Sequence, residues 1–168
     1  NSSADLCRDI CNSGYGINPL RTYNGPSCTG SCVLGSCVKI KGHQHYPNQT
    51  HNDPGPYWDW YKFYNLINNA PSVTTLSAAS GTFYDSGGPS ASYSNDERNV
   101  ILIQPTGATN VTVNFTQFDL ETNWDYMYIY DGATVNDPLI NRYTSTAGPG
   151  TITSTGGSLL IDFRSDCA

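Results

Sequence analysis

Residues 115–132, FTQFDLETNWDYMYIYDG, decide the fold, because acidic residues lead here directly into an apolar strand that a turn closes. Met127 begins that strand, and Asp131-Gly132 is the turn dipeptide. Similar short runs, rich in β-branched and aromatic residues, lie at 100–104, 111–115, 139–142, 151–154 and 158–163. Short runs with Gly-containing turns and no helical pattern between them predict a mainly β chain, an antiparallel β-sandwich. The pair Gly156-Gly157 is predicted to form a hairpin turn.

Acidic residues stand beside two of these strands. Glu121 and Asp125 precede one strand, and Asp166 follows the last one. Carboxylates gathered at one end of a sandwich repel each other unless a cation lies between them, and Ca²⁺ prefers six to eight oxygen ligands. Surface acids are also common at solvated strand ends, so the residues alone leave both interpretations open.

Residues 80–168 resemble a CUB domain through the segments SGTFYDSGG, SYSNDERN, FTQFDLETNWDYMYIYDG, PLI and SLLIDFRSD. The resemblance implies a β-sandwich with a calcium site. Glu121, Asp125 and Asp166 take the positions of its ligands, and Tyr93 takes the position of the tyrosine that orients the glutamate. It also implies a further strand after the final Ser-Asp pair, so the last strand of the domain is expected to be missing here.

One further acid, Asp85, lies in the sequence DSGG within the CUB-like region. It is either an additional calcium ligand or simply a turn residue.

The composition changes near residue 72. Five of the six Cys and all three His lie before it, and the small, polar stretch at 73–79 is predicted to be a linker. Residues 1–72 are predicted to form a small disulfide-stapled α+β segment. Its expected elements are a helix from Ser2 or Ser3 to Asn12, a strand at 38–40 and a helix at 57–68.

The cysteines divide unequally between the two parts. Cys7, Cys11, Cys28, Cys32 and Cys37 lie close together, whereas Cys167 stands alone. Five cysteines cannot all pair with one another. The remaining thiol could bond to Cys167 across the chain, stay free, or pair with a cysteine outside this sequence. We expect that Cys167 has its partner outside this sequence. Six cysteines also predict an oxidising location: secreted, on the cell surface or in the periplasm.

The segment GHQHYPNQTHNDPGPYWDW at residues 42–60 holds all three histidines. Imidazole and carboxylate groups suit zinc, and three ligands with one open position make a catalytic site. Exposed loop histidines and an Asn-Asp-Pro-Gly turn before a helix are the alternatives.

This segment resembles the last third of a zinc-dependent N-acetylmuramoyl-L-alanine amidase of the amidase-2 and peptidoglycan-recognition family. The features that carry the resemblance are Gly-His after a strand, a ten-residue step to Asp-Pro-Gly, and the aromatic-rich helix YWDWYKFYNLI. It implies that His43 and Asp53 bind zinc and that His51 assists catalysis by donating to the oxyanion. The family often has Lys at the position of His51, and His45 matches no ligand position.

The implied reaction is hydrolysis of the lactyl–L-Ala amide of peptidoglycan. The remaining zinc histidine and the residue that assists the water belong to the first half of that family's domain, and nothing here matches them. This segment by itself is therefore expected not to cleave peptidoglycan.

Together these features predict part of a secreted or cell-surface amidase that carries a calcium-binding CUB module. Expected partners are peptidoglycan or a muropeptide, a protein or glycan bound by the CUB domain, and the first half of the amidase. The alternative is a non-enzymatic adhesion or assembly protein with a structural amidase remnant. Sequons at Asn48, Asn110 and Asn114 matter only in a eukaryotic secretory host, and the pairing of the two modules favours a bacterial one.

Charge and hydropathy exclude two other classes. The net charge is −6, and the eight Lys and Arg residues are scattered singly, so the sequence has no basic stripe for nucleic acid. No apolar run approaches the roughly 18 residues that a membrane span needs.

Overall fold

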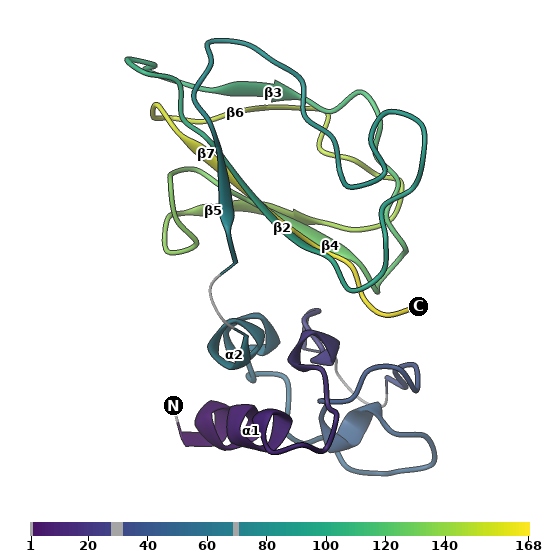
Figure 1. The fold of residues 1–168 in the computed structure, drawn as a ribbon. Coiled ribbons are helices and arrows are strands. Elements are labelled where there is room, and N and C mark those ends of the chain that lie inside the picture. The colour runs from purple at the N-terminus through teal and green to yellow at the C-terminus, as the bar shows by residue number, and fades with distance from the viewer. Residues whose placement is uncertain (1, 28–31, 69–70) are drawn as a thin grey trace. The chain divides into compact units, whose positions relative to one another are not determined.

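The computed structural model describes residues 2–27, 32–68 and 71–168. Contacts between residues divide the chain into two compact units (Figure 1). The N-terminal unit comprises Asn1–Ala70 together with Asp166–Ala168, and the second unit comprises Pro71–Ser165.

The N-terminal unit contains two α-helices, α1 at Ser2–Asn12 and α2 at Trp60–Ile67, and two 3₁₀ turns, η1 at Pro19–Arg21 and η2 at His43–His45. Helix α2 begins at Trp60 rather than at 57, because the Asp59 side chain accepts a hydrogen bond from the Lys62 N–H and caps the helix. Its buried side chains Trp60, Phe63, Tyr64 and Ile67 follow helical spacing. Arg8 of α1 donates to the carbonyl of Leu66 in α2.

The second unit contains seven strands, and Figure 1 draws them in two layers. They are β1 Val73–Leu76, β2 Arg98–Ile103, β3 Thr112–Asn114, β4 Tyr126–Tyr130, β5 Leu139–Tyr143, β6 Thr151–Thr153 and β7 Leu159–Arg164. Five strands form one sheet in the order β1-β2-β7-β4-β5, and β3 pairs with β6 in a second sheet. Apart from the parallel β1–β2 pair, all these pairings are antiparallel. The predicted β-sandwich is confirmed.

The core of the second unit lies between the two sheets. Alternate residues of β4 and β7 pack there, since successive side chains of a strand point to opposite faces. The buried members are Val111, Val113, Leu120, Met127, Ile129, Leu159, Ile161 and Phe163.

The central strand β7 also carries a buried ion pair. The Nη2 of Arg164 donates to Asp162 at 2.8 Å, and neither side chain is more than 1% exposed. The guanidinium also lies 5.8 Å from the centre of the Tyr128 ring. Side chains at positions i and i+2 of a strand point to the same face of the sheet, so Asp162 and Arg164 can form this ion pair.

Several sequence predictions are corrected here. The predicted linker at 73–79 contains β1, whose residues Val73–Leu76 align with Val100–Ile103, because the β-branched run VTTL pairs with the edge of the sheet. Gly156-Gly157 does not close a hairpin, since β6 and β7 lie in different sheets. The strand at 38–40 is reduced to a single bridge between Thr22 and Ile40.

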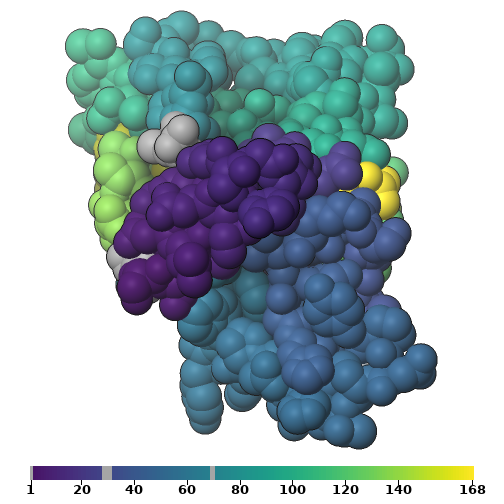
Figure 2. All heavy atoms as spheres, turned by 60° about the horizontal axis from the view of Figure 1, so that its bottom comes forward, coloured from purple at the N-terminus to yellow at the C-terminus, as the bar shows by residue number. Residues whose placement is uncertain are grey.

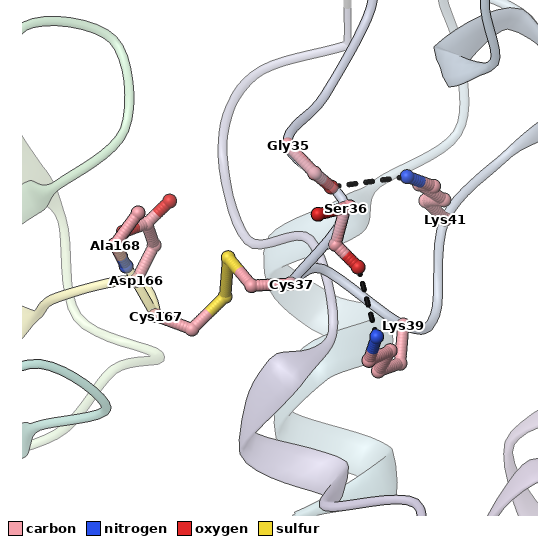
Figure 3. Close-up of a disulfide and its surroundings, with 8 residues drawn as sticks. All are labelled: Gly35, Ser36, Cys37, Lys39, Lys41, Asp166, Cys167 and Ala168. Atoms are coloured by element: carbon pink, nitrogen blue, oxygen red, sulfur yellow. Dashed lines mark hydrogen bonds between the residues drawn. A yellow bond between two sulfur atoms is a disulfide. The ribbon is translucent and has the colours of Figure 1, made fainter.

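The expectation for Cys167 is also wrong. It forms a disulfide with Cys37, with a Cα–Cα distance of 5.9 Å and a sequence separation of 130 residues (Figure 3). The bond across the chain is therefore the correct alternative. Cys32 is also disulfide-bonded, whereas Cys7 and Cys11 are free thiols.

The disulfide belongs to the N-terminal unit, which includes both of its cysteines. Lysine side chains brace the loop before Cys37, as Figure 3 shows. Lys39 donates to the carbonyl of Ser36, and Lys41 donates to that of Gly35. The disulfide thereby attaches the C-terminal residues Asp166–Ala168 to a loop held by its own hydrogen bonds.

Candidate metal sites

Carboxylates converge at one end of the β-sandwich. Glu121, Asp125 and Asp166 each offer an oxygen, and these oxygens lie within 4.8 Å of one another. Ligands bound to one Ca²⁺ at 2.3–2.6 Å are separated by at most about 5 Å, so the three oxygens fit within one coordination sphere. The donor set, oxygen only, is the one that Ca²⁺ prefers.

Tyr93 holds two members of this cluster in place. Its hydroxyl donates to Asp125 at 2.5 Å and accepts from the backbone N–H of Glu121 at 3.0 Å. Burial, and next the hydrogen bond to Asp125, raise the pKa of Tyr93 well above its usual range, so the hydroxyl remains a donor. The resemblance assigns Tyr93 the role of orienting the glutamate, and in the structure its hydroxyl is bonded to Asp125 and to the backbone N–H of Glu121.

Two residues that sequence reasoning missed support the cluster. Thr144 donates to the carbonyl of Glu121 and accepts from the N–H of Asn123, which bonds the turn at 121–125 to the chain after β5. Ser165, directly before Asp166, exchanges hydrogen bonds with Glu97 and donates to the carbonyl of Ser94. Hydroxyl residues at strand ends give no sequence signal that would have distinguished them.

Of the two interpretations of Asp85, the structure supports the one that makes it a turn residue. Its side chain accepts a hydrogen bond from the N–H of Gly87 at 2.8 Å, and the residue is exposed. A Cβ on Gly87 would lie 2.3 Å from the carbonyl oxygen of Ala91, so the turn needs glycine there.

A second cluster lies in the N-terminal unit. His43, His51 and Asp53 offer ligand atoms that all lie within 4.8 Å of one another, and all three residues are exposed. The Nδ1 atoms of His43 and His51 lie 3.6 and 3.7 Å from the same Asp53 oxygen. Figure 2 shows the segment that carries them, in blue, on the surface of this unit.

Backbone contacts position this cluster. The carbonyl of Asp53 accepts from the N–H of Gln44, next to His43. A Cβ on Gly42 would lie 2.5 Å from Pro54 and 3.2 Å from Trp60, so the two loops can approach each other only because residue 42 is glycine.

His45 is separate from this cluster. It is completely buried, its ring contacts those of Tyr23 and Trp60, and its Nδ1 accepts from the N–H of Gly42 at 2.9 Å. Burial, with a smaller contribution from Lys41, lowers the pKa of His45 to about 4. It is therefore a neutral core residue that orients the turn carrying His43.

Comparison with known proteins identifies the second unit. The CUB domain family model matches residues 72–168, which is more than half of the sequence. The chain belongs to the CUB family. Human cubilin is 28% identical over 159 residues, which cover 91% of this chain and 4% of cubilin.

Two further similar proteins match parts of the chain. N-acetylmuramoyl-L-alanine amidase A of Achromobacter lyticus is 36% identical over 69 residues, 40% of this chain and 38% of that protein. The MASP-1 CUB2 domain bound to Ca²⁺ is 23% identical and matches 45% of this chain and 70% of that one, with a TM-score of 0.39. The chain spans 38% or less of the length of both curated relatives.

CUB membership supports an extracellular protein-binding role, and the Cys37–Cys167 disulfide fits an oxidising environment. Within the described residues, no helix is both long and apolar enough to cross a membrane.

Proposed function

We propose that this CUB module binds calcium through Glu121, Asp125 and Asp166 and uses the ordered site to bind a protein or glycan outside the cell. The observation that carries the proposal is the convergence of three carboxylate oxygens within 4.8 Å. Asp125 is only 2% exposed, and a buried carboxylate is costly unless hydrogen bonds and a cation offset its charge. Calcium supplies that charge, and Tyr93 supplies a hydrogen bond.

Calcium titration of the chain tests this proposal. By isothermal calorimetry we expect one Ca²⁺ per chain, with binding weakened at least roughly tenfold by Glu121→Gln or Asp166→Asn. Asp85→Asn is the matched control, because Asp85 caps its own turn. Failure of the folded chain to bind Ca²⁺, or equal loss in the control, would contradict the proposal.

We further propose that the N-terminal unit is part of a secreted, bacterial cell-wall amidase, and that the CUB module holds this enzyme near peptidoglycan or a partner. The approach of His43 and Asp53 and the amidase relative support this second role. A zinc ion held there would supply a Lewis acid for the amide carbonyl and would lower the pKa of a bound water. His43 and Asp53 would hold the metal, and His51, whose Nδ1 lies 3.7 Å from the same Asp53 oxygen that His43 approaches, would contact the substrate oxygen.

Sedimentation with insoluble purified peptidoglycan tests the second role. We expect the chain to pellet with peptidoglycan in calcium, and less so in EGTA or with Glu121→Gln. A chain that stays in the supernatant in all three conditions would favour the alternative of a non-enzymatic adhesion or assembly protein.

A further inference from the structure

Asp166 is a candidate calcium ligand and also the immediate neighbour of a disulfide. It offers a carboxylate oxygen within 4.8 Å of the oxygens of Glu121 and Asp125. It also offers one within 4.8 Å of the sulfur atoms of Cys37 and Cys167, and Figure 3 shows these residues together. We infer that the Cys37–Cys167 disulfide regulates the calcium site by holding Asp166 in place, so that reduction of this bond weakens calcium binding. The inference rests on the proposed function, because it concerns the same calcium site.

The two sulfur atoms do not form a second metal site with Asp166. Cysteine binds metals as the thiolate, and both sulfurs are joined in the disulfide. The ligands that can share an ion with Asp166 are therefore Glu121 and Asp125, and the disulfide acts on Asp166 as a covalent anchor.

The chain before Asp166 is held by hydrogen bonds of Ser165. Its N–H donates to the carbonyl of Glu97 at 3.1 Å, and its hydroxyl donates to the carbonyl of Ser94 at 2.7 Å. These bonds fix the point at which the chain leaves strand β7. They do not fix the backbone torsion that follows, ψ of Asp166, or the direction of its side chain.

The chain after Asp166 is held by the disulfide. Cys167 is bonded to Cys37, whose loop is braced by two lysine side chains. The N–H of Ala168 donates to Oδ1 of Asp166 at 2.9 Å, so the path of the chain beyond Cys167 also orients the carboxylate. The disulfide thus constrains both the backbone and the carboxylate of a calcium ligand.

Reduction removes this constraint in two steps. A thiolate of a dithiol reductant attacks one sulfur, which forms a mixed disulfide and releases the other cysteine as a thiol. The second thiol of the reductant then displaces the remaining cysteine, so that the chain gains two electrons and two protons and the dithiol becomes a disulfide. Asp166 then loses its anchor, and calcium must order it on binding at a cost in free energy.

The coupling between the disulfide and calcium is reciprocal. Whatever factor the disulfide contributes to calcium affinity, calcium contributes to the stability of the disulfide over the dithiol form. A tenfold factor corresponds to about 30 mV in the reduction potential of this two-electron couple. Calcium binding and an oxidising environment therefore support each other at this site.

Calcium calorimetry of a disulfide-free variant tests the inference. We expect Cys37→Ser/Cys167→Ser, folded by circular dichroism at the temperature of the titration, to bind Ca²⁺ roughly tenfold more weakly than wild type. Cys7→Ser/Cys11→Ser is the matched control, because it removes two free thiols and leaves this disulfide intact, and it should keep wild-type affinity. Equal affinity in the disulfide-free variant and the control would overturn the inference.

A double-mutant cycle with Asp166→Asn separates the positioning of this ligand from general destabilisation. If the disulfide acts through Asp166, removing it from the Asp166→Asn chain weakens calcium binding by less than about twofold further. A further loss of roughly tenfold would mean that the disulfide acts on the fold as a whole, and this result would also overturn the inference.

Redox titration measures the same coupling in a chain whose site is unchanged. The Cys7→Ser/Cys11→Ser chain is equilibrated at pH 7 in mixtures of reduced and oxidised dithiothreitol, with Ca²⁺ or with EGTA. The thiols of Cys37 and Cys167 are then trapped with iodoacetamide and counted by mass spectrometry. Saturating calcium should shift the equilibrium roughly tenfold toward the disulfide, and Asp166→Asn should abolish the shift. The same equilibrium in Ca²⁺ and in EGTA would contradict the inference.

Failure of this inference and failure of the proposed function give different results. If the wild-type chain binds no Ca²⁺, both are wrong. If it binds Ca²⁺ with the same affinity in the presence and in the absence of the disulfide, only the inference is wrong, and Glu121, Asp125 and Asp166 remain the proposed calcium ligands.

Discussion

The hydroxyl of Tyr93 joins Asp125 to the backbone of Glu121, at 2.5 and 3.0 Å. One side chain 28 residues before Glu121 thus holds two of the three predicted calcium ligands in position. This geometry makes Tyr93 a positioning residue rather than a ligand.

We expect Tyr93→Phe to lower calcium affinity roughly tenfold while the fold is retained, because both hydrogen bonds are lost and the ring is kept. Calorimetric titration measures the change. The exposed Tyr84→Phe is the matched control. Unchanged affinity in Tyr93→Phe would show that the ligands are held without it.

Loss of the disulfide should destabilise the chain. Cys37→Ser is expected to lower the free energy of unfolding by about 2–5 kcal/mol, because a bond closing a loop this long restricts the unfolded chain. Urea denaturation measures the loss. Cys167→Ser and the double variant should show the same loss as the single one, and an additive loss in the double variant would mean that the two cysteines act independently.

Gly42→Ala tests the contact between the two histidine-bearing loops. The added Cβ would meet Pro54 and the carbonyl of Asp53, so we expect a loss of about 1–3 kcal/mol and weaker zinc binding. Thermal unfolding and zinc calorimetry report the two effects. Gly35→Ala, with only the Cys37 sulfur within 4 Å, should behave as wild type.

The buried ion pair of β7 should be sensitive to loss of one partner. Asp162→Asn leaves the Arg164 charge buried and is expected to cost about 3–5 kcal/mol. Chemical denaturation followed by Trp and Tyr fluorescence measures it. Asp119→Asn, at an exposed site, should change stability by less than about 0.5 kcal/mol, and an equally small effect at Asp162 would refute the prediction.

The free thiols of α1 should react slowly near neutral pH. Burial raises the pKa of Cys7 above its usual value, and burial together with the neighbouring Cys7 raises that of Cys11. Because the thiolate is the reactive form, labelling by iodoacetamide should need a higher pH than an ordinary thiol, whose pKa is about 8.5. Mass spectrometry of each cysteine at pH 7, 8 and 9.5 measures this. Labelling at pH 7 as fast as in the urea-unfolded chain would contradict it.

The sequence predicted the features that depend on local pattern. The alternation around Met127 and Ile129 predicts strands with one face in a core, since a strand has a period of two residues. The stretch at 115–132 marked Glu121 and Asp125 as candidate calcium ligands. The Gly-His and Asp-Pro-Gly motifs marked His43 and Asp53 as candidate zinc ligands. The metals assigned to them stay predictions.

Only the tertiary structure decided the features that depend on residues far apart in the chain. The pairing of Cys37 with Cys167, the parallel partner of Val73–Leu76 and the hydrogen bonds of Tyr93 each join segments that share no local signal. The burial of His45 and the exposure of His51 were likewise not predictable, because two histidines six residues apart carry the same chemistry in sequence. Packing against Tyr23 and Trp60 makes one a neutral core residue and leaves the other facing Asp53.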